Sequence, residues 1–296
     1  MANASWRQRR LARLLQQARE EKGIGLLEVA KIVGFSNAKM SRIESADSGV
    51  RDVDVDLICH ALDVPEEVKD KLMELARQAK QSNWWRSYSD ILGSADYIEL
   101  EADSDGIFSF TIDLIPGLLQ TADYCEAVIR ADVPLATEEA ISRRVEARME
   151  RQQQIRKNNV KVWAIIDEAA LLRPIGGHDV MADQIDQLID LTRLASVSIQ
   201  VLPLAAGAHQ SLGKPFTLFN LRDGFRVVGI DGREGGLFIE NEQRVRRTGE
   251  DWAELAAMAL PFAHSIELLR ARSGEHRRNS HEREKSRKVV QEQPQP

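Results

Sequence analysis

The sequence predicts an α+β protein in which a small all-helical domain is followed by a larger domain of mixed α and β structure. Two observations lead to this prediction. Over the first 80 residues, apolar side chains recur at helical spacing and are interrupted only by short glycine- or serine-containing breaks. After residue 160, short runs rich in Val, Ile and Phe alternate with helical patterns, which is typical of a sheet covered by helices.

Five short amphipathic helices are expected at the start of the chain, at residues 7–21, 26–33, 37–44, 53–62 and 66–80. Gly23 ends the first helix, because glycine readily adopts the left-handed conformation found at helix ends. A tight break at Gly34-Phe35-Ser36 separates the second helix from the third, and Ser36 is a good N-cap for the third. These helices predict a compact all-α domain at residues 1–82.

The second and third helices have the features of a helix-turn-helix, in which two helices meet at a sharp angle. Ala30 is small where the second helix must pack closely on the third, and Gly34 lies at the turn, where we expect a side chain to clash. Phe35, Met40 and Ile43 supply apolar contacts that hold the third helix against the core. The outer face of the third helix then consists of Asn37, Ala38, Lys39, Ser41 and Arg42.

This polar outer face predicts recognition of double-stranded DNA, because an α-helix fits the major groove and polar side chains can bond to base edges or phosphates. The base-reading candidates, by position, are Asn37, Lys39 and Arg42. The candidates for contact with the DNA backbone, which sets register and affinity, are Ser36, Ser41 and Arg51. The alternative is that the two helices serve only contacts between proteins.

The charge of the chain is distributed unevenly. The net charge is −6, yet residues 1–50 contain nine Lys or Arg against five Asp or Glu, whereas residues 83–273 contain 20 against 29. The local field, and not the net charge, attracts phosphates, so the acidic total does not exclude DNA binding. The basic run Arg7, Arg9, Arg10 and Arg13 is either part of a DNA-facing surface or a solvated helix face.

Residues 83–273 form the second predicted domain, after a hinge at residues 81–83. Its helical patterns lie at residues 94–110, 118–131, 137–157, 179–195 and 251–271. Its strand patterns lie at residues 160–166, 197–202, 216–221, 226–230 and 237–240. The helix between the first two strands indicates one βαβ crossover. Residues 274–296 lack apolar periodicity and are expected to be a disordered tail.

Four side chains of the second domain are candidates for binding a ligand or a partner, namely Trp84, Trp85, Gln120 and His209. The two tryptophans either anchor the hinge to the domain core or line a binding surface, where Trp is enriched. Gln120 follows a Pro-Gly-Leu-Leu stretch that is either a structural turn or a recognition loop. His209 stands beside Gln and Ser in an expected loop, and this is the best polar cluster for ligand contact.

No motif supports catalysis or a bound cofactor. The six histidines show no metal-ligand spacing, and Cys59 and Cys125 are far apart in the chain. The pair Asp167-Glu168 follows an expected strand and is a candidate catalytic pair, although this position is more typical of a helix cap. Sparse cysteines, together with the absence of an apolar run of about 18 residues and of a signal peptide, predict a cytoplasmic protein that binds no membrane. The lack of catalytic and metal-binding motifs predicts that the protein is not an enzyme and binds no metal.

Residues 11–80 resemble the phage-repressor-type (xenobiotic response element) helix-turn-helix family. The resemblance is based on the five helices and on the segment Ser36 to Glu44, which matches the family's Ser-x-x-x-x-Ser-Arg-Ile-Glu signature. One departure is that the family often has Thr-Gln at the start of its second helix, where this chain has Gly25-Leu26. Because that glutamine normally contacts a phosphate, the departure affects this one contact and not the fold.

Residues 84–273 resemble an actinobacterial domain family of unknown function that follows this type of helix-turn-helix. The motifs that match in order include Trp84-Trp85, the stretch Ile115 to Tyr124 and the stretch Arg173 to Gly177. Regulators of this kind often lie beside genes for very small partner proteins, so the resemblance implies a domain that senses an effector or docks a partner.

Two interpretations follow from these observations. In the first, the protein is a sequence-specific transcriptional regulator that binds operator DNA as a homodimer, and its second domain binds a small-molecule effector or a small partner protein. In the second, it is mainly an interaction protein, the antitoxin-like half of a two-protein module, which binds DNA for autoregulation.

Overall fold

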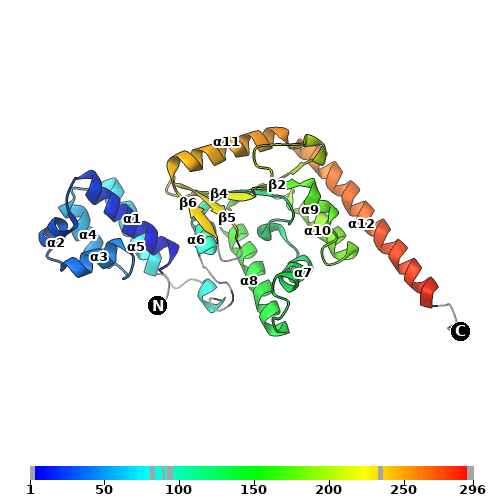
Figure 1. The fold of residues 1–296 in the computed structure, drawn as a ribbon, viewed down its shortest axis with the longest axis horizontal. Helices are drawn as coiled ribbons and strands as arrows, with labels where there is room; N and C mark the ends of the chain where they lie inside the picture. The colour runs from blue at the N-terminus through cyan, green and yellow to red at the C-terminus, as the bar shows by residue number, and fades with distance from the viewer. Residues whose placement is uncertain (1–3, 81–83, 89–90, 92–95, 233–235, 292–296) are drawn as a thin grey trace. The chain divides into compact units, whose positions relative to one another are not determined.

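The computed structural model describes residues 4–80, 84–88, 91, 96–232 and 236–291 (Figure 1). The chain divides into two units, Met1–Ser87 and Tyr88–Pro296. The predicted hinge at 81–83 and the predicted boundary at residue 82 lie outside the described residues. Trp84 and Trp85, which we expected to open the second domain, belong instead to the first unit.

The first unit contains the five predicted helices, each within two residues of its expected bounds. They are α1 (Trp6–Glu21), α2 (Leu26–Val33), α3 (Asn37–Glu44), α4 (Asp52–Ala61) and α5 (Glu66–Lys80). A short 3-10 helix, η1 (Trp84–Tyr88), follows them. The all-α character predicted for this part of the chain is therefore confirmed.

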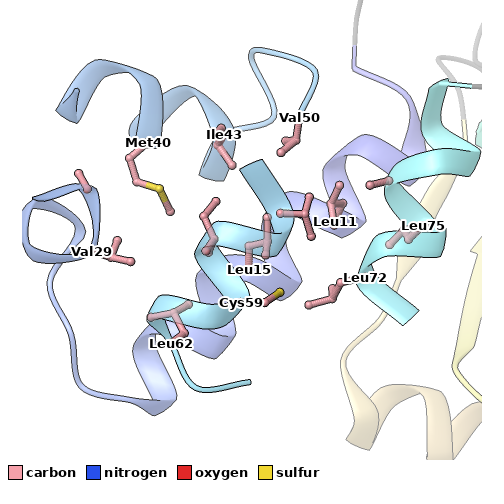
Figure 2. Close-up of a cluster of buried hydrophobic side chains, with 14 residues drawn as sticks. Leu11, Leu15, Val29, Met40, Ile43, Val50, Cys59, Leu62, Leu72 and Leu75 are labelled. Carbon is pink, nitrogen blue, oxygen red and sulfur yellow. The ribbon is translucent and has the colours of Figure 1, made fainter. Parts of the chain in front are cut away.

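The apolar faces of the five helices meet in one core, shown in Figure 2. Leu11 and Leu15 of α1 lie at its centre, and Met40 and Ile43 attach α3 to it. Gly34, at the turn between α2 and α3, has φ +74°, and a Cβ there would meet no atom within 4 Å. The expected clash is therefore wrong: the turn requires glycine because its backbone is left-handed.

The second unit is built on one six-stranded sheet with the strand order β3-β2-β1-β4-β5-β6. The strands are β1 (Ser104–Thr111), β2 (Lys161–Asp167), β3 (Val197–Leu202), β4 (Phe216–Leu221), β5 (Arg226–Ile230) and β6 (Leu237–Ile239). β1, β2 and β3 run parallel, and β4, β5 and β6 add antiparallel neighbours. The predicted βαβ crossover is present, because α10 (His178–Leu191) connects the parallel strands β2 and β3.

Helices cover both faces of the sheet (Figure 1). α11 (Glu242–Met258) covers one face, where Phe108 of β1 and Trp163 of β2 pack around Trp252 of the helix. On the other face lie α6 (Asp96–Asp103) and α8 (Glu138–Lys157), joined to each other by an ion pair between Glu101 and Arg151. The described part of the unit also contains α7 (Ala122–Asp132) and α9 (Glu168–Leu172) and the short 3-10 helices η2 (Gly117–Leu119) and η3 (Leu204–Ala206).

The structure corrects the prediction of one helix over residues 94–110. The helix α6 ends at Asp103, and the next eight residues form β1, the strand that joins the parallel and antiparallel halves of the sheet. Side chains of β1 alternate between the two sheet faces, and both edges of the strand are hydrogen-bonded to neighbouring strands. This pairing outweighs the weak helical spacing of the segment.

The structure also corrects the C-terminal prediction. The helix expected over 251–271 is two helices, because Pro261 separates α11 from α12 (Phe262–Gln291). α12 continues through residues that we expected to be a disordered tail from 274 onward. The first residues of this segment pack on α10, since His276 is buried and Arg277 is paired with Asp183 and Asp186 of that helix.

Candidate nucleic-acid interface

The candidate interface is the outer face of α3. Ser36 caps this helix by accepting a hydrogen bond from the backbone N–H of Lys39, at 3.2 Å. Met40 and Ile43 are fully buried in the core of the unit. The helical period then leaves four exposed side chains on the opposite face, namely Asn37, Ala38, Ser41 and Arg42.

Lys39 lies at the edge of this face and is held by groups of the same unit. Its Nζ is 2.9 Å from Oδ1 of Asp54 and 3.4 Å from the ring centre of Phe35. Arg51 binds the same carboxylate, with Nε 3.0 Å from Oδ2 and Nη2 3.0 Å from Oδ1 of Asp54. The two predicted DNA contacts Lys39 and Arg51 therefore share one buried anion, which offsets part of their positive charge.

The hydrogen bonds from Arg51 and Lys39 lower the pKa of Asp54 to about 2, against the cost of burying its charge. Asp54 is thus ionised at neutral pH and ties the first turn of α4 to α3. Because Lys39 also stacks on the ring of Phe35, a base contact from Lys39 requires the release of both interactions.

A second ion pair holds the opposite end of α3. Nε and Nη2 of Arg19 in α1 lie 2.7 and 2.8 Å from the two carboxylate oxygens of Glu44, the last residue of α3. Nη1 of Arg19 also donates to the carbonyl oxygen of Ile24. This two-pronged geometry fixes the direction of α3 relative to α1 as well as its distance from the core.

Sequence reasoning found the exposed residues of α3 but missed the charges that hold it. Asn37, Ser41 and Arg42 lie together on the exposed face, as expected, whereas Ser36 uses its hydroxyl for the helix cap. In the sequence, Glu44 stands out only as the last residue of the family signature. No local pattern marks its role, because its partner Arg19 is 25 residues away in the sequence.

The candidates Trp84 and Trp85 pack within the first unit. Their rings meet edge to face, with centroids 5.9 Å apart and an interplanar angle of 87°. Trp85 is buried, and the guanidinium carbon of Arg7 lies 5.7 Å from the centre of its ring. Of the two alternatives for Trp85, these contacts favour an anchoring role, and the element that Trp85 contacts is α1.

Gln120 and His209 contact different parts of the second unit. Gln120 is buried, donates to the carbonyl oxygen of Ile115 and accepts a hydrogen bond of 2.8 Å from Nη1 of Arg148. His209 packs edge-on against Phe110, with ring centroids 5.6 Å apart. Phe110 belongs to the core on the α11 side of the sheet, so the two candidates do not form one site.

The pair Asp167-Glu168 is used structurally. Asp167 caps α9 by accepting a hydrogen bond of 2.9 Å from the N–H of Ala169, as the sequence favours. Glu168 forms an ion pair with Arg272 of α12 and accepts a hydrogen bond from the N–H of Leu204. Together these contacts connect the end of β2 to α12.

Comparison with known proteins adds two matches. A family described as helix-turn-helix domain matches residues 10–72, and a family described as domain of unknown function (DUF5753) matches residues 94–271. A comparison with curated proteins gave no match. Among the helices of the described residues, none is long and apolar enough to cross a membrane.

The first match indicates a DNA-binding regulator and agrees with the geometry of α2 and α3. The second confirms the resemblance of the larger domain to a family of unknown function, although the match begins at residue 94 and so leaves out Trp84 and Trp85. Since this match spans more than half of the chain, the protein belongs to the DUF5753 family, and in this chain the DUF5753 domain follows a helix-turn-helix domain.

Proposed function

We propose that the protein is a sequence-specific transcriptional regulator of the phage-repressor type, in which α3 enters the major groove of DNA. The main support is the exposed face of α3, where Asn37, Ser41 and Arg42 stand together on a helix fixed at both ends by ion pairs. Preorganised side chains of this kind can meet base edges without first ordering the helix.

Within this proposal, Asn37 and Arg42 read bases, and Ser41 contacts the DNA backbone. Lys39 and Arg51 share the carboxylate of Asp54, so the three groups together carry one net positive charge, and their main contribution is to attract the phosphates of DNA. We further propose a homodimer that binds two half-sites about 34–36 Å apart, the spacing of one helical turn. The second domain has a binding and not a catalytic role, and its ligand shifts the affinity for DNA by linkage.

The experiment is a selection of genomic DNA fragments by the purified full chain at near-physiological salt, followed by anisotropy titration of the recovered site. Salt near the physiological level is needed because low salt rewards non-specific binding. A motif with two half-sites is expected if the protein acts as a dimer. Enrichment of no sequence by a folded sample would contradict the proposal.

Arg42→Ala provides the residue-level test. We expect it to weaken binding to the selected site by about 1–3 kcal/mol and to relax the preference at one base position. Lys71→Ala, which removes an exposed cation of α5, is the matched control and should leave the preferred sequence unchanged. Equal losses on specific and random DNA would instead assign Arg42 to the phosphate backbone.

A further inference from the structure

The second unit contains a cleft on the sheet face opposite α11. Its volume is about 450 Å³, and an adjoining hollow of about 790 Å³ shares Pro116, Gly117, Arg148 and Arg151 with it. Strand alternation turns Phe108 and Phe110 of β1 toward α11 and leaves the small polar side chains Ser109 and Thr111 to line the cleft.

Three arginines of α8 face this space. Arg144, Arg148 and Arg151 follow each other at intervals of four and three residues, which places them on one side of the helix. Arg151 is neutralised, because its guanidinium lies 2.6 and 2.9 Å from the two carboxylate oxygens of Glu101.

The other two arginines form no ion pair with the described residues. Arg148 forms one hydrogen bond, to the neutral side-chain oxygen of Gln120 at 2.8 Å. The Nε of Arg144 is buried without a hydrogen-bond partner. Three aspartates, Asp113, Asp132 and Asp231, border the space. The charges of Asp231 and Glu101 act on Arg148 from beyond ion-pair distance and offset its burial only in part, since its pKa is still lowered.

Leaving a largely buried cation without an anion is costly, and folded proteins seldom do so without a functional reason. The cost is visible at Arg148, whose pKa is lowered by burial and by the neighbouring charge of Arg151. Gly117 leaves room for the Arg148 side chain, because a Cβ at this position would lie 3.3 Å from Nη1 of Arg148 and would press on the guanidinium.

We infer that this cleft binds a small organic anion, whose carboxylate or phosphate group is held by Arg144 and Arg148. Guanidinium groups suit both anions, because their N–H donors form a planar fork. Apolar side chains on the walls, including Ile107, Leu118 and Phe238, provide room for a compact uncharged body beside the anionic group. The inference deepens the proposed function by naming the chemical class of the ligand of the second domain.

The test is calorimetric titration of the full chain with inorganic phosphate and, separately, with citrate, against chloride at equal ionic strength. The two arms distinguish phosphate from carboxylate as the preferred group. Saturable binding of at least one anion is expected, and the absence of saturable binding of both up to about 10 mM would overturn the inference. The titration contains no DNA, so the absence of anion binding would leave the DNA-binding proposal intact. Conversely, a protein that does not bind DNA could still bind the anion in this titration.

Variants then identify the site. Arg148→Gln and Arg144→Gln should each weaken anion binding at least tenfold, whereas Lys157→Gln, which removes an exposed cation from the end of α8, should not. Without anion, Arg148→Gln should unfold at the same temperature as the wild type or a higher one, because the buried charge is gone. Anion binding that survives both substitutions would overturn the inference, as would an Arg148→Gln variant that unfolds earlier yet binds equally well. If Arg148→Gln does not fold, Arg144→Gln decides.

Discussion

Breaking the ion pair between Arg19 and Glu44 tests whether charge, in addition to apolar packing, holds α3 in place. The exposed fractions of the two side chains are 12% for Arg19 and 6% for Glu44, so solvent screens the pair little. Glu44→Gln leaves the guanidinium with only Glu20 as a counter-charge, which is 3.6 Å away and 58% exposed. We expect the first unit to lose about 2–4 kcal/mol, slightly less than for a fully buried pair, because Arg19 keeps its bond to the carbonyl of Ile24.

The assay is a double-mutant cycle of Arg19→Gln and Glu44→Gln in the full chain, with local stability measured by hydrogen exchange of peptides from α1 and α3. The expected coupling energy is about 1.5–3 kcal/mol. The control is Glu74 and Arg77 of α5, whose exposed fractions are 51% and 52% and for which we expect about 0.5 kcal/mol or less. A coupling between Arg19 and Glu44 as small as the control would refute the reasoning.

Two further predictions concern stability. The pKa of Asp54 is lowered to about 2 in the folded protein, so its contribution is complete above pH 4 and is lost as the pH falls toward 2. Acid titration of helicity should therefore show a loss of about 1–2 kcal/mol over this range that is absent in Asp54→Asn. Truncation after Ser273 removes the buried His276 and the ion pairs of Arg277, and should lower the unfolding temperature of the second unit by several degrees. An unchanged midpoint would restore the expectation of a tail without structural role.

The first unit could be predicted almost completely because its signals are local. Each helix has its own apolar period, and the breaks at Gly23 and Gly34 are read from single residues with φ +68° and +74°. The exposed face of α3 follows from the same period. The ion pairs that orient α3 could not be predicted, since Arg19 and Glu44 are 25 residues apart and only the angle between α1 and α3 brings them together.

The second unit was harder because its elements depend on partners that are distant in sequence. β1 has a mixed apolar pattern and becomes a strand when β2 and β4 pair with it on both sides. The polar face of α12 has no apolar period, yet Ser273 and Arg277 bind α10 through a hydrogen bond and an ion pair. His276 contacts His178 of α10 and the carbonyl oxygen of Leu171 in α9. Hydrophobic periodicity does not detect a helix that is held by polar contacts.

The number of charged residues in a segment does not predict how many of those charges are unpaired and exposed in the folded protein. Counting residues 1–50 gives a surplus of cations, but Arg7 and Arg10 are buried, with their guanidinium carbons 5.7 and 5.1 Å from the ring centres of Trp85 and Trp6. Arg19 and Lys39 are bound to carboxylates. The reverse holds in the second unit: its sequence is acidic, yet Arg148 lies in a cleft without an ion-pair partner among the described residues. Because Coulomb energies depend on the nearest counter-charge and on burial, the composition of a domain does not predict which of its charged side chains remain available to a ligand.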